Sequence, residues 1–377
     1  MDDKKIKVAL VQDWLTSLGG AEKVLGELLK IYPDADIYTL VATDEIVEAL
    51  GVKGRVTQSF ITHLPFSKKC YRKYMQFFPL AIEGFDLSGY DLIISSSSSV
   101  AKGVLTNSSQ THICYCHSPA RYVWDLCGQY LKDAGLTSRY NPLAFYARRI
   151  MHKFRVWDVV SANRVDYFVA NSYYIANRIN KTYRRNAKVI YPPVYVDEFV
   201  LNENSRSDFY FTVSRLVSYK KIKLIVEAFS KMPDKQLYIA GIGPEYKKIK
   251  AVATSNIHLL GYVSMDDVKH YMSEAKAFIF AADEDFGIAP VEAQATGTPV
   301  ICFAKGGVLE TVSENVSGVY FYEQTASSLI EAVHKFETMK FDPHVVRENV
   351  MKFSSERFVE QITALIEDVM KIGRAHV

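Results

Sequence analysis

Residues 284–292 read Glu-Asp-Phe-Gly-Ile-Ala-Pro-Val-Glu, and this stretch decides how the chain is interpreted. It follows a short apolar run, residues 278–281, which is typical of a buried strand. Pro290 suits the first turn of a helix, where its missing amide hydrogen is not needed. The stretch therefore predicts a strand, a loop that contains Glu284, and a helix whose beginning contains Glu292.

The two carboxylates of this stretch suit the recognition of a sugar nucleotide. One would hold sugar hydroxyls and the other the diol of a ribose. Gly287 lets the backbone approach a ligand closely, and the free amides at the start of a helix attract a phosphate group. The alternative is a solvated acidic loop followed by a glutamate that the helix dipole favours. For two glutamates at this spacing in isolation, that alternative is the more common one.

A second group of charged residues lies in Ser-Arg-Leu-Val-Ser-Tyr-Lys-Lys, residues 214–221, between an expected strand (209–213) and an expected helix (222–229). Arg215 offers a planar fork of donors and Lys220 a point charge. A diphosphate at the end of a strand suits both side chains. The alternative is a pair of solvated charges on a loop.

Near the N-terminus, residues 13–22 (Asp-Trp-Leu-Thr-Ser-Leu-Gly-Gly-Ala-Glu) lie between an expected strand, residues 7–11, and a helical pattern. Gly19 and Gly20 would let backbone amides approach a ligand. The loop has neither the G-x-G-x-x-G pattern of dinucleotide-binding proteins nor the Gly-Lys-Ser/Thr of a P-loop. A plain strand-to-helix turn is therefore the alternative.

His117 follows another expected strand, residues 112–115, in Cys-His-Ser-Pro-Ala-Arg-Tyr. A lone histidine is more often structural than catalytic, but its place at a strand end favours a role in a binding site. Weaker signals are glycines after two further strands, which would line a nucleotide or form only turns: Gly241 with Gly243, and Gly306 with Gly307.

The composition is that of a globular protein with a large core, because 49% of the 377 residues are apolar and 23% are charged. The net charge of +3 argues against a dedicated nucleic-acid-binding protein. Five cysteines without zinc or disulfide spacing, and the absence of metal-binding motifs, predict reduced thiols and no metal. No apolar run reaches the roughly 18 residues of a transmembrane helix, and we expect a cytoplasmic protein.

Apolar runs alternate with helical patterns along the chain, which predicts an α/β protein with parallel sheets. The pair Pro192-Pro193 is typical of a linker, and the alternation begins anew after it. The expected strands are residues 7–11, 92–94, 112–115, 167–169, 188–190, 209–213, 236–240, 277–280 and 299–303, and the serine run 95–99 is expected to be a loop.

We therefore predict an N-terminal domain of residues 1–191 and a C-terminal domain of residues 192–353. Residues 354–371 would form a C-terminal helix that packs back toward the N-terminal domain. Residues 372–377, Ile-Gly-Arg-Ala-His-Val, match a peptide that a common sequencing adapter encodes. We interpret them as non-native, so that the natural C-terminus would be incomplete.

The ordered set of these segments resembles the glycosyltransferases of family 4, also called glycosyl transferases group 1, over nearly the whole chain. In the C-terminal half the matching segments are SRLVSYKK (214–221), AGIGPE (240–245), LLGYVS (259–264), EDFGIAPVEAQATGTPVI (284–301) and GGVLETV (306–312). In the N-terminal half they are DWLTSLGGAEKVL (13–25), CHSPARYVWD (116–125), RVDYFVANS (164–172) and YPPVYVDEF (191–199).

The resemblance implies the GT-B fold, in which two Rossmann-like domains with parallel sheets face a central cleft. It implies a nucleotide-sugar donor bound mainly by the C-terminal domain and an acceptor bound mainly by the N-terminal domain. It also implies a retaining reaction without a divalent metal. A front-face mechanism through an oxocarbenium-like state is expected, with a double displacement as the alternative.

Residue by residue, the resemblance places Glu284 at the hydroxyls of the donor sugar and Glu292 at the ribose. Arg215 and Lys220 would hold the diphosphate and stabilise the leaving group. His117 matches a histidine that lies near the sugar, so the expected catalytic residues are His117, Glu284, Arg215 and Lys220. Further donor contacts are expected from Gly19, Gly20, Gly241, Phe286, Gly287 and Ile288, and acceptor contacts from Asp13, Trp14 and Arg121.

The sequence of residues 117–125 and 284–293 is most similar to that of bacterial enzymes that build O-antigen or exopolysaccharide. Many of these enzymes use GDP-mannose and extend a lipid-linked oligosaccharide, so this donor is favoured and a glycan or lipid-linked oligosaccharide is the expected acceptor. The sequence departs from the usual residues of the family at two nearby positions. Lys221 stands where the wider family often has glycine, and Lys223 stands where an acidic residue is more usual.

Residues 147–188 carry ten Lys and Arg but only two acidic residues, and four aromatic side chains lie in or beside their first part. A basic and aromatic surface would dock on anionic lipid, which suggests a peripheral place on the inner face of the cytoplasmic membrane. The alternative is a solvated face above ordinary core aromatics.

Two rival functions stay open. A nucleotide-sugar 2-epimerase shares the GT-B architecture but would lack the context of the two glutamates. A non-catalytic sugar-nucleotide-binding partner of a glycosyltransferase complex would keep the fold. Donor turnover separates the second rival from an enzyme, because a binding protein leaves the donor intact.

Overall fold

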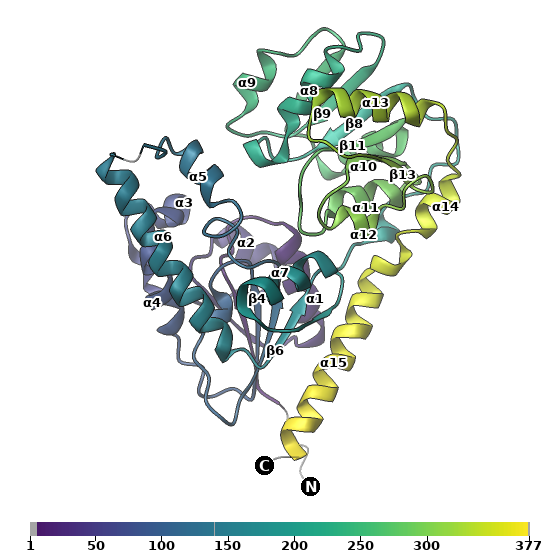
Figure 1. Cartoon of the computed structure of the whole chain (residues 1–377). Coiled ribbons are helices and arrows are strands. Elements are labelled where there is room, and N and C mark those ends of the chain that lie inside the picture. The colour runs from purple at the N-terminus through teal and green to yellow at the C-terminus, as the bar shows by residue number, and fades with distance from the viewer. Residues whose placement is uncertain (1–5, 139, 376–377) are drawn as a thin grey trace. The chain divides into compact units, whose positions relative to one another are not determined.

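The computed structural model describes residues 6–138 and 140–375. The chain divides into two compact units, residues 1–192 with 358–377 in the first unit and residues 193–357 in the second. Each unit holds one parallel sheet with helices packed on it (Figure 1). The predicted α/β fold with two Rossmann-like halves is therefore confirmed. No helix among the described residues is both long and apolar enough to cross a bilayer.

The first unit is built on a seven-stranded parallel sheet of order β3-β2-β1-β4-β5-β6-β7. Every residue of β1 is buried, because Leu10 faces one hydrophobic cluster and Val11 faces another on the opposite side of the sheet. The strands are β1 Val8–Gln12, β2 Asp36–Thr39, β3 Val56–Gln58, β4 Leu92–Ser97, β5 Thr111–Cys116, β6 Tyr167–Ala170 and β7 Ala187–Val189.

Helices cover both faces of this sheet. The apolar stripe of α1, which includes Leu25 and Leu28, packs in the cluster on one face. The buried residues of α4 and α6, which include Phe78 and Phe154, pack in the cluster on the other face. The helices of the unit are α1 Gly20–Ile31, α2 Asp44–Ala49, α3 Ser67–Cys70, α4 Phe78–Glu83, α5 Cys127–Asp133, α6 Pro142–Ser161 and α7 Tyr173–Tyr183, with the short 3-10 turns η1 Phe60–His63, η2 Tyr71–Phe77, η3 Ala101–Gly103 and η4 Ala162–Arg164.

The second unit is built on a six-stranded parallel sheet of order β10-β9-β8-β11-β12-β13. The strands are β8 Phe209–Val213, β9 Gln236–Ala240, β10 Ile257–Gly261, β11 Ala277–Phe280, β12 Val300–Phe303 and β13 Gly318–Phe321. The helices are α8 Ile222–Phe229, α9 Tyr246–Lys250, α10 Met265–Glu274, α11 Ile288–Ala295, α12 Val308–Thr311, α13 Ala326–Glu337 and α14 Pro343–Glu348, with the 3-10 turns η5 Val196–Glu198, η6 Ser218–Lys220 and η7 Met351–Phe353.

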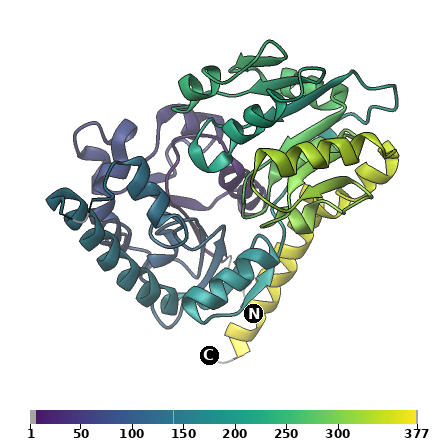
Figure 2. The same cartoon turned by 45° about the horizontal axis from the view of Figure 1, so that its top comes forward.

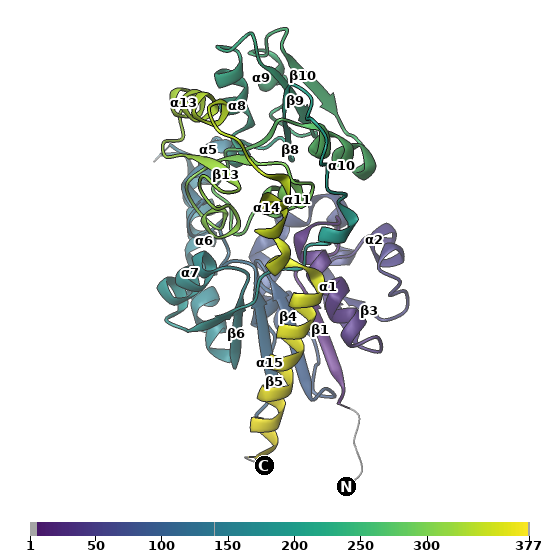
Figure 3. The same ribbon diagram turned by 90° about the vertical axis from the view of Figure 1, so that its right-hand side faces the viewer.

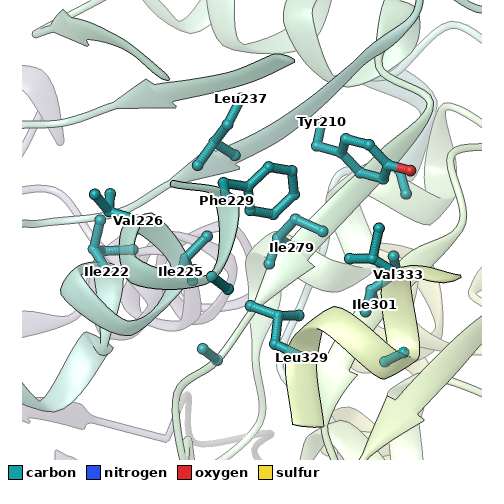
Figure 4. Packing of buried hydrophobic residues seen from close by; sticks show 14 of the residues in the cluster. Tyr210, Ile222, Ile225, Val226, Phe229, Leu237, Ile279, Ile301, Leu329 and Val333 are labelled. Atoms are coloured by element: carbon teal, nitrogen blue, oxygen red, sulfur yellow. The ribbon is translucent and has the colours of Figure 1, made fainter. Parts of the chain in front are cut away.

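The core of the second unit lies between this sheet and the helices α8 and α13. The buried positions of α8 recur at helical spacing, and Ile225 and Phe229 pack with Leu237 and Ile279 of the sheet (Figure 4). Burial of each such side chain contributes about 1.5–3 kcal/mol. Leu329 of α13 completes the cluster, and α13 contacts β12 and β13 (Figure 2).

The last helix, α15 Ser355–Ala375, returns to the first unit, as Figure 3 shows. Its apolar residues recur at helical spacing, and the ring of Phe358 lies 5.7 Å from that of Tyr115 in β5. Of the residues that we interpret as non-native, 376–377 lie outside the described residues. The backbone of residues 372–375 belongs to α15.

Several elements begin and end where the sequence predicts them, among them β8, β9, β11 and α8. The loop expected at 95–99 is partly wrong, because Ser95, Ser96 and Ser97 belong to β4 and are buried between β1 and β5. Four strands were not predicted, β2, β3, β10 and β13, because they are short and mix apolar with polar residues or glycine.

The ten basic residues between 148 and 188 do not form one free charged surface, which corrects that part of the sequence interpretation. They are spread over α6, η4, α7, β7 and the turn between α7 and β7. Several are engaged inside the unit. Arg164 pairs with Glu83 and Arg178 with Asp125, whereas Arg155 donates to a backbone carbonyl.

Candidate active site

In both sheets the strand order reverses beside the first strand. β2 and β3 lie on one side of β1 and β4 lies on the other, and the same holds for β9, β10 and β11 around β8. Open parallel sheets bind ligands where the order reverses, at the carboxyl ends of the strands. Most of the predicted site residues follow these strands, so each unit gathers its candidates at such a switch point.

The structure brings Lys220 and Glu284 together, although they lie 64 positions apart in the sequence. Lys220 ends η6, just after β8, and Glu284 follows β11. Their Nζ and Oε1 atoms are 2.8 Å apart, and both side chains are about one-fifth exposed, at 21% and 20%. A partly exposed pair of this kind adds little stability, whereas its two charges suit a ligand that carries both phosphate and hydroxyl groups.

Arg215 stands on the same loop as Lys220. Its side chain is exposed and forms no ion pair with any residue that the structure describes. The loop is fixed by glycines that follow the neighbouring strand β9, because a Cβ at Gly241 would lie 1.9 Å from the carbonyl oxygen of Ser214 and one at Gly243 would lie 2.4 Å from that of Leu216. These glycines therefore shape the loop that presents the guanidinium.

Gly306 and Gly307 fix the loop of Glu284 in the same way. The amide of Gly307 donates to the carbonyl oxygen of Glu284 over 2.8 Å. A Cβ at Gly306 would lie 2.3 Å from that same oxygen, and a Cβ at Gly307 would lie 2.4 Å from Cα of Phe286. The two glycines allow the close contact that holds the backbone beside the carboxylate.

The helix predicted after this loop is α11, which begins at Ile288 with Pro290 in its first turn. Gly287 caps it with φ of 86°, a left-handed conformation that favours glycine. Phe286 is buried, and its ring lies 5.3 Å from that of Phe353. Glu292 is also buried, in the second turn of α11.

Lys221, where the wider family often has glycine, adopts the left-handed conformation with φ of 58°. We expect Lys221→Gly to raise the free energy of unfolding by up to about 1 kcal/mol, because glycine adopts this conformation without steric cost. Lys221→Ala is the control, since alanine removes the charge but keeps the Cβ. Denaturant melts of both variants check this, and equal stabilities would show that the backbone conformation is not the cause.

In the first unit, Asp13 joins the ends of β1 and β4. Its buried carboxylate accepts hydrogen bonds from the amides of Ser98, Val100 and Ala101 and from the hydroxyl of Ser98, at 2.6–2.9 Å. Burial raises the pKa of Asp13, and these donors oppose the shift. The carboxylate therefore holds the loop after β4, and acceptor contact by Asp13 stays a prediction.

His117 follows β5 at the same edge of the sheet. Its Nε2 atom lies 2.8 Å from Oγ of Ser96, and its backbone amide donates to Ser97 over 2.8 Å. Burial lowers the pKa of His117 to about 4, so the imidazole is neutral at neutral pH. Ser96 was not predicted as a site residue, and only its place in the serine run after a strand pointed to it.

Gly19 and Gly20 stand at the start of α1, as predicted. The side chain of Glu22 contacts this helix start. Its carboxylate accepts a hydrogen bond from the amide of Gly19 and lies 3.5 Å from Nε2 of Gln12. Burial raises the pKa of Glu22 to about 7. The sequence analysis assigned Glu22 no role, although a glutamate three residues after a helix cap is a known signature.

This raised pKa predicts a pH dependence of stability. Between the unfolded pKa near 4.5 and the folded pKa near 7, only the folded chain keeps the proton of Glu22. The stabilising contribution of Glu22 is therefore present below pH 4.5 and is lost as the pH rises through 7. Relative to the wild type, Glu22→Gln is expected to gain about 2–3 kcal/mol in the free energy of unfolding between pH 5 and pH 8.

Urea melts at the two pH values measure the effect. Glu48→Gln, on the exposed side of α2, is the matched control and should follow the wild type. If the free energy of unfolding of Glu22→Gln changed with pH as that of the wild type does, a group other than Glu22 would hold the proton.

The other two predicted acceptor residues of the first unit, Trp14 and Arg121, are partly buried. The ring of Trp14 lies 5.1 Å from that of Tyr71 and packs at the border of the cluster on that face. Arg121 is half-buried in the turns after His117. Among the described residues no group of three or more His, Cys, Asp or Glu side chains is placed to hold a metal ion.

Comparison with known proteins gives two family matches that together span most of the chain. Residues 18–198 match the model of Glycosyltransferase Family 4, and residues 196–353 match the model of Glycosyl transferases group 1. An uncharacterized glycosyltransferase of Methanocaldococcus jannaschii is 28% identical over 54% of this chain and 60% of its own. An alpha-1,3/1,6-mannosyltransferase of Saccharomyces cerevisiae is 26% identical over 62% of this chain and 54% of its own. The matches thus span little more than half the length of these relatives.

Solved structures show the same fold over nearly the whole chain. Sucrose-phosphate synthase of Thermosynechococcus elongatus matches with a TM-score of 0.69 and 18% identity, over 98% of this chain and 100% of its own. An Anabaena protein in complex with UDP-glucose matches with a TM-score of 0.68 and 17% identity, over 96% and 99%. Fold and matches define the class as a glycosyltransferase of the GT-B fold. The chain belongs to glycosyltransferase family 4, the glycosyl transferases group 1.

Proposed function

We propose that the chain transfers a hexosyl group from a nucleotide-sugar to a hydroxyl group of a glycan or lipid-linked oligosaccharide, with retention of the anomeric configuration. The observation that carries the proposal is the 2.8 Å pair of Lys220 and Glu284 at the switch point between β8 and β11, with the exposed Arg215 on the same loop. These charges match the two chemical parts of such a donor, because cations suit its diphosphate and a carboxylate suits its sugar hydroxyls.

In the proposed reaction the bond between the sugar C1 and the diphosphate oxygen breaks, and a bond from C1 to the acceptor oxygen forms. Lys220 and Arg215 stabilise the negative charge that develops on the leaving diphosphate. The acceptor proton passes to that diphosphate. Glu284 orients the donor sugar through its hydroxyls, Glu292 is assigned to the ribose, and the neutral His117 contacts the sugar. No divalent metal takes part in this scheme.

Mannose is the proposed sugar and GDP-mannose the proposed donor. The resemblance to O-antigen and exopolysaccharide enzymes supports this choice, and the yeast relative is a mannosyltransferase. The complex of the Anabaena neighbour with UDP-glucose supplies the competing donor to be tested.

Thermal shift with GDP, GDP-mannose, UDP and UDP-glucose tests the donor. A ligand at a hundred times its dissociation constant raises the free energy of unfolding by about 2.7 kcal/mol, which is easily detected. Stabilisation by the guanosine ligands alone is expected. Stabilisation by the uridine ligands alone would contradict the mannose assignment while keeping the donor site, and a nucleotide-sugar that binds without being consumed would favour a non-catalytic binding protein.

A lipid-linked acceptor would place the enzyme at the inner face of the cytoplasmic membrane as a peripheral protein. This location is part of the proposal. The charge pattern of the first unit supports this location. The surface that carries the charge is not the whole segment 147–188.

A further inference from the structure

Two stretches of the first unit contain no acidic residue at all, although Asp and Glu make up 42 of the 377 residues of the chain. They are residues 59–82 and residues 140–157, and each carries four Lys or Arg. The first stretch forms η1, α3, η2 and most of α4, and the second forms most of α6. These two stretches therefore place eight Lys and Arg on a few helices with no acidic residue among them, and of these cations Lys68 is paired with Asp44 of α2.

The two stretches lie side by side. The hydroxyl of Tyr146 donates to Oε1 of Gln76 over 2.7 Å. Between them runs a groove of about 400 Å³ whose walls include Phe77, Tyr146 and Trp157 as well as the cations Arg149 and Lys153. We call this groove, with the exposed side chains of residues 59–82 and 140–160 around it, the basic-aromatic surface.

Several of its cations have no counter-charge within the protein. Arg149 and Lys153, one helical turn apart on α6, are exposed and form no ion pair with any described residue. The same holds for Lys69 of α3 and Lys73 of η2 in the first stretch. Their positive charge is therefore available to a partner.

Large apolar side chains are exposed around these cations. Phe145 and Val156 lie on the same outer face of α6 as Arg149 and Lys153, at helical spacing. Phe66 is 83% exposed although its φ of 54° is costly for a residue other than glycine. The exposed apolar residues of the surface are Phe60, Phe66, Phe77, Leu80, Tyr140, Leu143, Phe145, Tyr146, Val156 and Val160.

The inner face of α6 is fixed to η3, the turn that follows β4. Nζ of Lys102, just after β4, lies 2.5 Å from Oδ1 of the buried Asp158 on α6. Nε1 of Trp124 and the hydroxyl of Tyr183 donate to the other oxygen of Asp158. A partner bound on the outer face of α6 would therefore hold the first unit in a defined orientation.

We propose that the basic-aromatic surface docks the first unit on an anionic phospholipid bilayer. Arg149 and Lys153 meet the phosphates of the head groups, and the aromatic and aliphatic side chains enter the boundary between head groups and acyl chains. Cations mixed with exposed leucine, valine and phenylalanine fit this partner, because a bilayer offers negative charge and hydrocarbon together. The inference rests on the proposed function, in which the acceptor is carried on a lipid.

Co-sedimentation with vesicles tests the docking surface. The wild type is expected to bind vesicles of mixed phosphatidylglycerol and phosphatidylcholine, to bind vesicles of phosphatidylcholine alone much more weakly, and to dissociate at high salt, which screens the charges. The double variant Arg149→Glu with Lys153→Glu is expected to lower the partition onto the mixed vesicles at least tenfold. The variant Leu80→Ser with Phe145→Ser should also lower it.

The matched control is Lys247→Glu with Lys250→Glu on α9 of the second unit, where two exposed lysines also form no ion pair with any described residue. It changes the net charge by the same amount and should bind vesicles like the wild type. A wild type that does not bind the mixed vesicles at low salt, or an Arg149/Lys153 variant that binds like the control, would overturn the proposal.

Donor turnover in solution separates this result from a failure of the proposed function. Release of nucleoside diphosphate without vesicles should be the same in the wild type and in the Arg149/Lys153 variant, because neither residue belongs to the candidate active site. A variant that has lost vesicle binding but keeps turnover confirms the docking surface. A wild type that binds vesicles but consumes no donor would overturn only the transfer reaction.

Discussion

Replacing Glu284 by glutamine is expected to lower the rate of donor turnover about a hundred- to a thousandfold, since the loss of one electrostatic group at the reacting centre typically costs such factors. The free energy of unfolding should change by no more than about 1 kcal/mol, because the pair with Lys220 is partly solvated. The loop itself would persist, since it is held by its backbone contacts with Gly306 and Gly307. Release of the nucleoside diphosphate under donor saturation measures the effect.

Two variants separate this catalytic role from a structural one. Glu227→Gln removes an ion pair of the same kind, between Glu227 and Lys223 on α8 of the same unit, and should leave turnover unchanged. The charge exchange Lys220→Glu with Glu284→Lys restores an ion pair with the opposite polarity. If the exchange recovered turnover, the pair would serve only the fold, and Glu284 would leave the list of active-site residues.

The second large effect is expected for Arg215→Ala. The guanidinium has no ion-pair partner among the described residues, so its removal should leave stability unchanged. The affinity for the nucleoside diphosphate should fall about ten- to a hundredfold, because a hydrogen bond to a charged group contributes about 1.5–3 kcal/mol. Turnover should fall by a factor of about a hundred to a thousand, because charge on the leaving diphosphate loses one donor.

Isothermal titration with the nucleoside diphosphate and initial rates check both parts. Lys231→Ala is the matched control, since it removes another exposed cation of the same unit, after α8. Equal affinities for Arg215→Ala and the wild type would place the diphosphate elsewhere.

Much of the fold was predictable because strands such as β8 and β11 are short apolar runs bounded by turns. The bounds of β8 were predicted without error, and those of β11 to within one residue. The alternation of strands and helices was enough to give the class. By contrast, β4 runs three residues further than predicted, because Ser95 to Ser97 satisfy their backbone groups in the ladder with β1 and β5. Such pairing depends on neighbours that are distant in the sequence.

The candidate site was also predictable from the sequence only in part. The sequence placed Arg215, Lys220 and Glu284 at strand ends, but it treated the lysine and the glutamate as members of separate groups. Only the order of the strands shows that β8 and β11 are neighbours and that the two side chains meet. The sequence also could not show that the carboxylate of Asp13 accepts hydrogen bonds from the loop after β4, or that Ser96 contacts His117.

The glycines and the basic residues show how position in space changes an interpretation. Gly306 and Gly307 looked like a turn or a nucleotide contact, and the structure shows that they make room for the backbone of the Glu284 loop. The basic residues of 147–188 looked like one surface, but partners from other segments engage several of them. The free cations of α6 instead lie beside residues that precede them by about seventy positions, such as Gln76 and Phe77.

Parallel assays of donor consumption test the central claim most directly. Wild type and Glu284→Gln are each incubated with GDP-mannose and with UDP-hexoses, and the release of nucleoside diphosphate is followed. The account predicts that the wild type consumes at least one donor, with GDP-mannose favoured, and that Glu284→Gln binds this donor but consumes it about a hundred- to a thousandfold more slowly. Equal consumption by both proteins, or binding of a donor by the wild type without consumption, would contradict it.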